Sequence, residues 1–327
     1  MDGGGAAERT VLVTGAGGYI GRELIEAITR DEAGLRIVAV DVRDWPATER
    51  LLGVTYHVAD IRDSAFGRIV ARERPDAVVH LASVVGAGGD PDFDYSIDVL
   101  GTRNVLDACL AAGVEQLIVT SSGAAYGYHA DNPAWLNESH PLRGNEDFPY
   151  SRNKRLVEEM LAEARERHPR LRQLVFRPGT VLGRRVANQI TALFEKSFVL
   201  GVAGSASPFV FIWDADVINC IVKGVRECAA GVYNLAGDGA LPMREIAALL
   251  GKPYVPLPAG LIGAALGTAR LLGRGRLGPE HVKFLRYRPV LDNARLKAEF
   301  GYTPALTSRQ AFERFVVPRA AAGRMAA

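Results

Sequence analysis

The sequence predicts an α/β fold: a doubly wound parallel sheet covered by helices on both faces, followed by a small, mostly helical C-terminal lobe. In the first half of the 327-residue chain, short β-branched runs alternate with longer stretches of helical period. Several of these runs are apolar throughout, which is typical of strands buried on both faces. Beyond Gly183 the alternation weakens, and residues 259–315 have a mostly helical pattern. This order of elements indicates a parallel sheet whose crossovers contain helices.

The predicted strands are short runs rich in Val and Ile, each ending near a small or acidic residue. Six of them are assigned to the sheet: residues 10–15, 36–41, 54–60, 76–82, 116–122 and 171–179. Two later runs are also strand-like: residues 208–213 and 231–237.

The predicted helices lie between these runs. In the first helix, residues 21–31, Leu24, Ile25 and Ile28 share one apolar face. A single long helix is expected over residues 96–113, because Gly113 is a common residue type at a helix C-terminus. Further helices are expected at residues 64–73, 150–168 and 244–251.

The composition excludes several functional classes. The formal net charge is +2, so we expect no nucleic-acid partner. The three cysteines are an odd number, and neither they nor the histidines have metal-ligand spacing, so we expect no metal site and a cytoplasmic location. The first residues, MDGGGAAER, contain Asp2 and no apolar core, which argues against a signal peptide.

One uncharged segment, residues 253–269, needs separate interpretation. It is shorter than the roughly 20 residues of a spanning helix, and its prolines cluster at the front. We therefore expect no integral membrane span. A buried or interfacial helix from about Ala259 is the favoured interpretation, and a role at a membrane surface is the alternative.

A glycine-rich turn, VTGAGGYIG, leaves the first predicted strand and enters the first helix. Its glycines, Gly15, Gly18 and Gly21, suit a turn with positive φ, close approach of a pyrophosphate and tight packing of helix on strand. The helix N-terminus then offers N–H groups to phosphates. The turn predicts a dinucleotide-binding Rossmann domain.

An acidic residue, Asp41, ends the second strand. A carboxylate there can accept hydrogen bonds from an adenosine ribose and repel a 2′-phosphate, which favours NAD over NADP. Arg43 is near enough to weaken that preference, and a turn cap is the alternative role of Asp41. Asp60 and Ile61 follow the third strand, where they can border the adenine.

We expect the chain to divide into two parts. Residues 9–183 and about 213–237 form the NAD-binding domain, and about 184–212 and 238–315 form the substrate-binding lobe. Residues 1–8 and 318–327 are expected to be flexible tails.

The segment YSRNK, residues 150–154, opens a helix at the mouth of the predicted site. Tyr150 and Lys154 lie four residues apart, on one helix face. An ammonium beside a phenol favours the phenolate, so Tyr150 can exchange a proton with a substrate hydroxyl or carbonyl. Ser122, at the end of the fifth strand, can hydrogen-bond the same substrate oxygen, and Lys154 can hold the nicotinamide ribose.

Taken together, these motifs resemble the extended short-chain dehydrogenase/reductase family, in the branch of NAD-dependent epimerases and dehydratases. The resemblance covers residues 9–315. Its motifs are TGAGGYIG (14–21), HLAS (80–83), VLGTRNVLDAC (99–109), TSSGAAYG (120–127), YSRNK (150–154) and RPGTVLG (177–183).

The resemblance implies that Ser122, Tyr150 and Lys154 are catalytic and that NAD is the cofactor. It also implies a homodimer formed by the helices at 99–113 and 150–168. With the residues derived above, the expected cofactor contacts are Gly15, Gly18, Tyr19, Ile20, Gly21, Asp41, Arg43, Asp60, Ile61, Leu81, Ala82, Ser83, Thr120, Tyr150, Lys154 and Val181.

Two positions depart from the family pattern. Asp98 stands where many members have Asn before VxGT, which puts an Asn-dependent proton relay in doubt. Thr180 stands where sugar-nucleotide epimerases usually have an Asn that contacts the substrate diphosphate. Thr180 lacks the amide donor, so the RPG form is closer to reductases of hydroxysteroid- or flavanonol-type alcohols and ketones.

The substrate contacts are less specific in the sequence. The candidates are Val84, Ser122, Gly123, Thr180 and Arg184. Arg184 and Arg185 are either surface charges or contacts for a substrate anion. Phe209, Phe211 and Trp213 are expected in the core, with the wall of a substrate pocket as the alternative, and His80 is expected to be a packed core histidine.

The leading functional hypothesis is an NAD-dependent oxidoreductase that transfers hydride to or from a secondary alcohol or ketone of a small molecule, with Tyr150 as acid/base. It predicts free exchange of NAD and weak binding of UDP-sugars. The alternative is an NAD-dependent nucleotide-sugar 4-epimerase, similar to UDP-glucose 4-epimerase, or a dehydratase. A regulatory NAD-binding protein without activity is disfavoured, because binding alone does not require Ser122, Tyr150 and Lys154.

Overall fold

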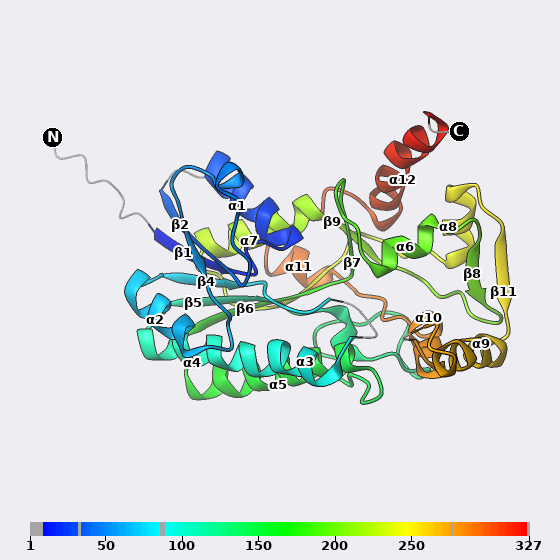
Figure 1. Ribbon diagram of the computed structural model, residues 1–327, viewed down its shortest axis with the longest axis horizontal. Helices are drawn as coiled ribbons and strands as arrows, with labels where there is room; N and C mark the ends of the chain where they lie inside the picture. Colours follow the sequence, from blue (N-terminus) through cyan, green and yellow to red (C-terminus); the bar gives the residue numbers. More distant parts are fainter. Residues whose placement is uncertain (1–8, 32–33, 86–88, 276, 326–327) are drawn as a thin grey trace.

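A computed structural model describes residues 9–31, 34–85, 89–275 and 277–325. Its centre is a seven-stranded parallel sheet of order β10-β6-β5-β4-β1-β2-β3 (Figure 1). The strands are β1 Arg9–Thr14, β2 Leu35–Asp41, β3 Val54–Val58, β4 Ala77–His80, β5 Gln116–Thr120, β6 Arg172–Pro178 and β10 Gly231–Leu235. The predicted doubly wound parallel sheet is therefore confirmed.

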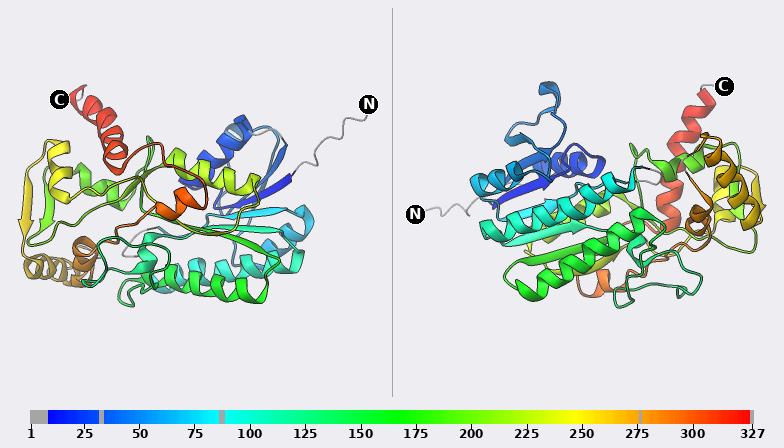
Figure 2. Two further views of the ribbon diagram at one scale, coloured as in Figure 1. Left: turned by 180° about the vertical axis from the view of Figure 1, so that it is seen from behind. Right: turned by 60° about the horizontal axis from the view of Figure 1, so that its bottom comes forward.

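Helices cover both faces of this sheet because successive strand residues point to opposite sides. In β1, Val11 and Val13 pack with the helices of one face, and Leu12 packs with those of the other. The first face carries α1 Tyr19–Asp31, α7 Asp214–Arg226 and α11 Ala294–Ala298. The second carries α2 Ser64–Glu73, α4 Thr102–Ala112 and α5 Pro149–Arg167, of which α4 and α5 run side by side in Figure 2.

The long helix predicted over residues 96–113 is confirmed in extent, since helical backbone runs unbroken to Ala112 and Gly113 caps it with φ +69°, but it begins earlier and contains a π segment that was not predicted. The chain forms α3, Pro91–Tyr95, then a π-helical segment, Ser96–Gly101, and only then α4. Within the π segment, Thr102 Oγ1 donates a 2.5 Å hydrogen bond to the carbonyl of Asp98. Hydrophobic spacing does not distinguish a π segment from an α-helix, and such segments are frequent at functional sites.

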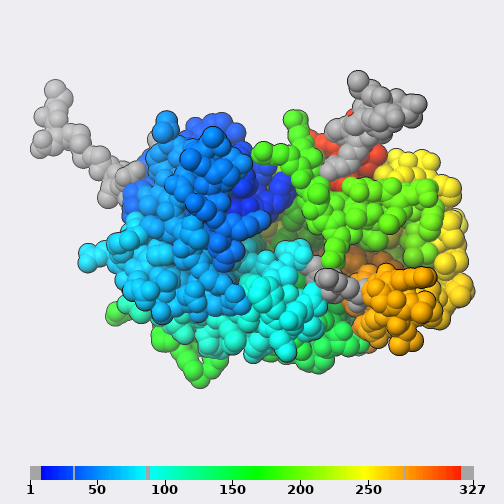
Figure 3. All heavy atoms as spheres, viewed as in Figure 1, coloured from blue at the N-terminus to red at the C-terminus, as the bar shows by residue number. Residues whose placement is uncertain are grey.

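The C-terminal lobe lies beyond the carboxyl edge of the sheet (Figure 1). Figure 3 shows its yellow and orange segments on the side of the molecule opposite the blue N-terminal part. Two small parallel pairs form part of it, β7 Thr180–Leu182 with β9 Phe211–Trp213 and β8 Val199–Val202 with β11 Tyr254–Leu257; the second pair was not predicted. Its helices are α6 Gln189–Glu195, α8 Met243–Leu250, α9 Ala259–Leu271, α10 Val282–Arg286 and α12 Ser308–Met325.

Helix α12 continues to Met325, so residues 318–325 are helical where the sequence suggested a flexible tail. The other predicted tail, residues 1–8, lies outside the described residues. Within the described part of the chain, no helix has both the length and the apolar character needed to cross a membrane.

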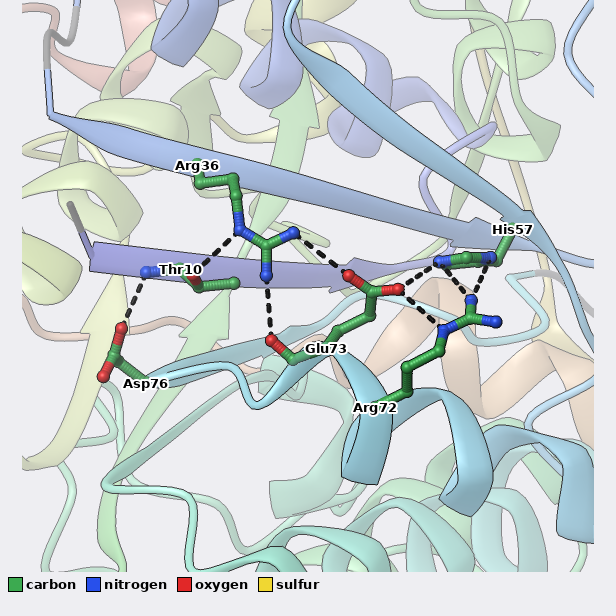
Figure 4. A network of polar contacts seen from close by, with 6 residues as sticks. All are labelled: Thr10, Arg36, His57, Arg72, Glu73 and Asp76. Carbon is green, nitrogen blue, oxygen red and sulfur yellow. Dashed lines mark hydrogen bonds and ion pairs between the residues drawn. The ribbon is translucent and has the colours of Figure 1, made fainter.

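A polar network joins the end of α2 to the sheet, as Figure 4 shows. The Glu73 carboxylate accepts hydrogen bonds from Arg36 at 3.0 Å and Arg72 at 3.1 Å, and it contacts His57 at 3.0 Å. Burial opposes ionisation of Glu73, but the bonds from Arg36, Arg72 and His57 outweigh it and hold the pKa of Glu73 below its usual value. This network fixes the position of α2.

Candidate active site

The glycine turn between β1 and α1 has no room for side chains. Gly15 has φ +66°, and a Cβ built on it lies 2.6 Å from the backbone nitrogen of Ala82. A Cβ on Gly21 lies 2.4 Å from the Gly15 carbonyl oxygen. The turn therefore brings the backbone of β4 and the first turn of α1 together, and this close cradle fits the pyrophosphate of a dinucleotide.

Asp41 lies directly beside this turn. Its carboxylate accepts hydrogen bonds from the Gly17 nitrogen at 2.9 Å and from the Arg43 nitrogen at 3.0 Å. The Arg43 side chain is exposed and its Nε is 3.6 Å from the same carboxylate. The cap contacts considered for Asp41 are thus present, and they orient the carboxylate next to the turn where a ribose would lie.

The neighbouring strand ends hold the next predicted contacts. Asp60 binds Arg62 through both carboxylate oxygens, and these hydrogen bonds lower the pKa of Asp60. Ile61 is buried, and its carbonyl accepts a hydrogen bond from Asn104 of α4 at 2.5 Å. Leu81 donates from its nitrogen to the carbonyl of Thr14. These contacts line the carboxyl edge of β1, β3 and β4.

Lys154 is connected to Asp98 through Ser83. The Lys154 ammonium donates to Ser83 Oγ at 2.9 Å, and Ser83 Oγ donates to Asp98 Oδ1 at 2.7 Å. The Val84 nitrogen also donates to Asp98 Oδ1, at 3.0 Å. Asp98 is 2% exposed, and its Oδ2 is buried without a hydrogen-bond partner among the residues that the structure describes. The departure from the family pattern therefore places a buried carboxylate behind the predicted catalytic lysine.

Tyr150 and Ser122 stand on two elements that are tied together. Tyr150 is half-buried in the first turn of α5, and the Lys154 Nζ is 5.6 Å from the centre of its ring. Ser122 caps the turn of residues 123–126, and the Ser151 hydroxyl donates to the Ala124 carbonyl in that turn at 2.6 Å. Among the described residues, the phenolic oxygen of Tyr150 has no hydrogen-bond partner, so it is available to a substrate.

A buried ion pair stabilises the strand end that precedes Ser122. Arg177 Nη2 lies 2.6 Å from Glu158 Oε2, and Glu158 also accepts a hydrogen bond from the Ser121 hydroxyl at 2.5 Å. Arg177 Nη1 donates to the hydroxyl of Tyr126 at 2.7 Å. Breaking a buried pair leaves an uncompensated charge, so this network holds the strand end before Ser122 in one position.

His80 is a core residue, as the sequence predicts. It is 3% exposed, and its two ring nitrogens lie 2.7 Å from the Thr14 hydroxyl and 2.9 Å from the Thr102 hydroxyl. Burial, and secondarily the charge of Lys154, lower the pKa of His80 to about 3. His80 is therefore a neutral residue that joins β1, β4 and α4.

The loop after β7 contacts the cofactor-turn helix. The Tyr19 hydroxyl donates to Asp214 Oδ2 at 2.5 Å, and a Cβ built on Gly183 would collide with both groups. Arg185 is bound to Glu23 and Glu26 of α1, which makes it a surface ion-pair residue. Arg184 is exposed. Gly123 packs against Leu291, and Val181 pairs with Ile212 in β9.

Arg288, which the sequence analysis missed, lies beside Thr180. Its Nη2 donates to the Thr180 hydroxyl at 3.4 Å, while its Nη1 is buried and has no partner in the described part of the chain. Its guanidinium carbon is 3.7 Å from the ring centre of Phe209 and 4.4 Å from that of Phe284. Burial lowers the pKa of Arg288 to about 10, and no carboxylate among the described residues pairs with it.

The one cue to Arg288 in the sequence is the lack of any acidic residue in 281–291. Phe209, Phe211 and Trp213 are buried as expected, and the ring of Phe209 also carries this guanidinium. A desolvated arginine with a free donor is suited to bind a phosphate or carboxylate. The candidate site therefore brings together a glycine cradle suited to a pyrophosphate, a phenol suited to proton transfer and a guanidinium suited to an anion.

Comparison with known proteins places this geometry among nicotinamide enzymes. The model of the NAD dependent epimerase/dehydratase family matches residues 11–236. UDP-glucose 4-epimerase 2 of Oryza sativa subsp. japonica is 33% identical over 184 residues, covering 52% of this chain and 44% of that protein. The 2-alkyl-3-oxoalkanoate reductase of Stenotrophomonas maltophilia is 25% identical over 336 residues, covering 95% and 99%.

Among solved structures, the UDP-glucose 4-epimerase of Thermus thermophilus in complex with NAD has the same fold. It superposes with a TM-score of 0.73 at 24% identity, covering 94% of this chain and 98% of that one.

Proposed function

This chain belongs to the NAD-dependent epimerase/dehydratase family, and on that premise we propose that it acts on a nucleotide-diphosphate sugar as a 4-epimerase or dehydratase. It is an enzyme of the extended short-chain dehydrogenase/reductase family, and NAD is its cofactor. The leading hypothesis from the sequence, a simple alcohol or ketone oxidoreductase, takes second place, because the comparisons favour the alternative.

The choice of substrate class rests on Arg288. Arg288 has a buried Nη1 that no described residue pairs with, and it lies next to Thr180, the position at which an epimerase Asn would contact a diphosphate. A buried donor without a partner costs free energy that a bound anion recovers. Arg288 therefore supplies the anion contact that Thr180 lacks.

The other roles follow from the geometry of α5 and its neighbours. We assign to Tyr150 the exchange of a proton with the substrate hydroxyl, to Ser122 a hydrogen bond to that oxygen, and to Lys154 the ribose of the nicotinamide. NAD supplies the hydride acceptor when bound. Asp41 and the glycine turn hold its adenosine and pyrophosphate.

A second candidate, a reductase of a small ketone, is favoured by a specific observation. Thr180 lacks the amide donor, and the Stenotrophomonas maltophilia reductase matches nearly the full length of this chain. A reductase must release its cofactor after each turnover, whereas an epimerase must retain it between half-reactions.

The test separates the two candidates by cofactor retention and by anion binding. Freshly purified protein is denatured and its supernatant is assayed for dinucleotide; UDP and UDP-glucose are then titrated by calorimetry. The proposal expects near-stoichiometric NAD and micromolar binding of UDP-glucose. Freely exchanging NAD with no detectable UDP binding would instead support the reductase.

A matched pair of variants locates the anion contact. Arg288→Met should weaken UDP binding about tenfold or more, because a hydrogen bond to a charged group is lost. Arg286→Met is the control, since Arg286 ends α10 two residues before Arg288 and its guanidinium lies over the Tyr287 ring instead. If both variants lost UDP affinity equally, the assignment of Arg288 as the anion contact would be wrong.

Three further expectations stay proposals. They are the homodimer formed by residues 99–113 and 150–168, the division into an NAD-binding domain and a substrate lobe, and a cytoplasmic location. Light scattering of the purified protein tests the dimer, and a monomeric mass would contradict it.

A further inference from the structure

The outer face of α9 is apolar although it faces water. Leu261 is 56% exposed, Leu271 is 89% exposed and Leu272, directly after the helix, is 62% exposed. Between them on the same side are three more exposed uncharged residues, Ala264, Ala265 and Thr268. Only Ile262 and Gly263 of the helix are buried. A helix on a protein surface normally presents polar residues to water.

This face lies at the outer end of the C-terminal lobe, away from the sheet (Figures 1 and 2). Beside it runs an apolar groove of about 600 Å³ between α9 and the start of α10. Its walls include Gly267, Leu271, Pro279 and Val282. Contiguous exposed apolar surface of this kind marks a site of interaction.

The charge of the surrounding segment indicates what covers the face. Residues 252–288 contain seven basic side chains and one acidic side chain, Glu280. Of the seven, Arg288 lies in the candidate site and Lys283 pairs with Asp147 at 2.7 Å. Glu280 pairs with Arg270 at 2.7 Å, whereas Arg274, just beyond the exposed leucines, has no ion-pair partner among the described residues. Two copies of this chain joined through α9 would bring these like charges together, which disfavours self-association.

We propose that α9 docks on the surface of a bilayer that contains anionic phospholipids. The helix has 13 residues, too few to span a bilayer, so it would lie in the interface with its leucines among the acyl chains. Arg274, just after the exposed leucines, then lies close to the phosphate headgroups.

Flotation with lipid vesicles tests the proposal on the full-length protein. Vesicles of phosphatidylcholine with about one third phosphatidylglycerol should carry the protein upward, and added salt should reduce the bound fraction. The double variant Leu271→Ser, Leu272→Ser should lower the partition coefficient about tenfold or more. Arg274→Glu should lower it about tenfold for the anionic vesicles only.

The control is Leu52→Ser, because Leu52 is 94% exposed on the loop before β3, outside the lobe. It should bind vesicles like the unmodified protein. Retention of NAD by every variant checks that it is folded. Equal flotation of the unmodified protein and the double variant would overturn the proposal. So would a change in the mass of the vesicle-free protein on Leu271→Ser, Leu272→Ser, because it would assign the face to a second copy.

Discussion

The network around Glu73 and the polar groups around Lys154 and Arg288 differ in whether the protein satisfies them. Arg36, His57 and Arg72 each contact the Glu73 carboxylate (Figure 4). In the candidate site, Arg288 Nη1 and Asp98 Oδ2 are buried, and no described residue forms a hydrogen bond with either atom. Buried polar groups are nearly always paired, so each exception needs an explanation.

The difference separates residues that hold the fold from residues that await a ligand. The partners of the Glu73 carboxylate all come from the protein itself. Their effect is to hold α2 in position against the sheet. On the proposed function, a substrate supplies the missing partners in the candidate site, and until it binds the unpaired groups there cost stability. Tyr150 belongs to the second class, because its phenol has no hydrogen-bond partner among the described residues.

The largest effect is expected at Tyr150. Tyr150→Phe removes the proton carrier but no contact within the described protein, so turnover should fall about 10²–10⁴-fold while NAD binding and stability stay near normal. Stopped assays measure the turnover, and fluorescence titration measures the affinity for NAD. Tyr95→Phe is the control for loss of a tyrosine hydroxyl near α5. Retention of more than about a third of the normal rate would contradict the role of Tyr150.

The glycine turn and the Tyr150–Lys154 pair could be located from the sequence, because both depend on the spacing of residues close together in the chain. The strands of the sheet were predictable because their apolar runs are continuous. Arg288 was not, because its environment comes from Phe209 and Thr180, far away in the chain. The π-helical segment at Ser96–Gly101 and the pair β8–β11 carry no periodic signal that separates them from a helix or a loop.

The second effect distinguishes a satisfied arginine from an unsatisfied one. Arg36→Met leaves the part-buried Oε2 and carbonyl oxygen of Glu73 without their Arg36 donor, so it should lower the free energy of unfolding by about 1–3 kcal/mol and leave UDP binding unchanged. Arg288→Met removes an unpaired buried charge, so stability should hold or rise while UDP affinity falls about tenfold to a hundredfold. Denaturant unfolding gives the free energy of unfolding of each variant, and calorimetry gives its affinity for UDP. If Arg288→Met destabilised the protein as much as Arg36→Met, Arg288 would be a structural residue.

The smallest effect is expected at Asp98, which acts on Lys154 only through Ser83. Asp98→Ala leaves the Ser83 hydroxyl and the Val84 nitrogen without their acceptor, so Lys154 loses its fixed partner and turnover should fall about tenfold. Asp98→Asn keeps an oxygen at that position and should recover turnover to within about threefold of normal. This rescue separates positioning from charge, because the amide carries no charge. Asp94→Asn is the control, since Asp94 lies in the adjacent α3 and is not bonded to Ser83. If both Asp98 variants were equally slow, the carboxylate charge would be required, and Asp98 would act on Lys154 through charge rather than position.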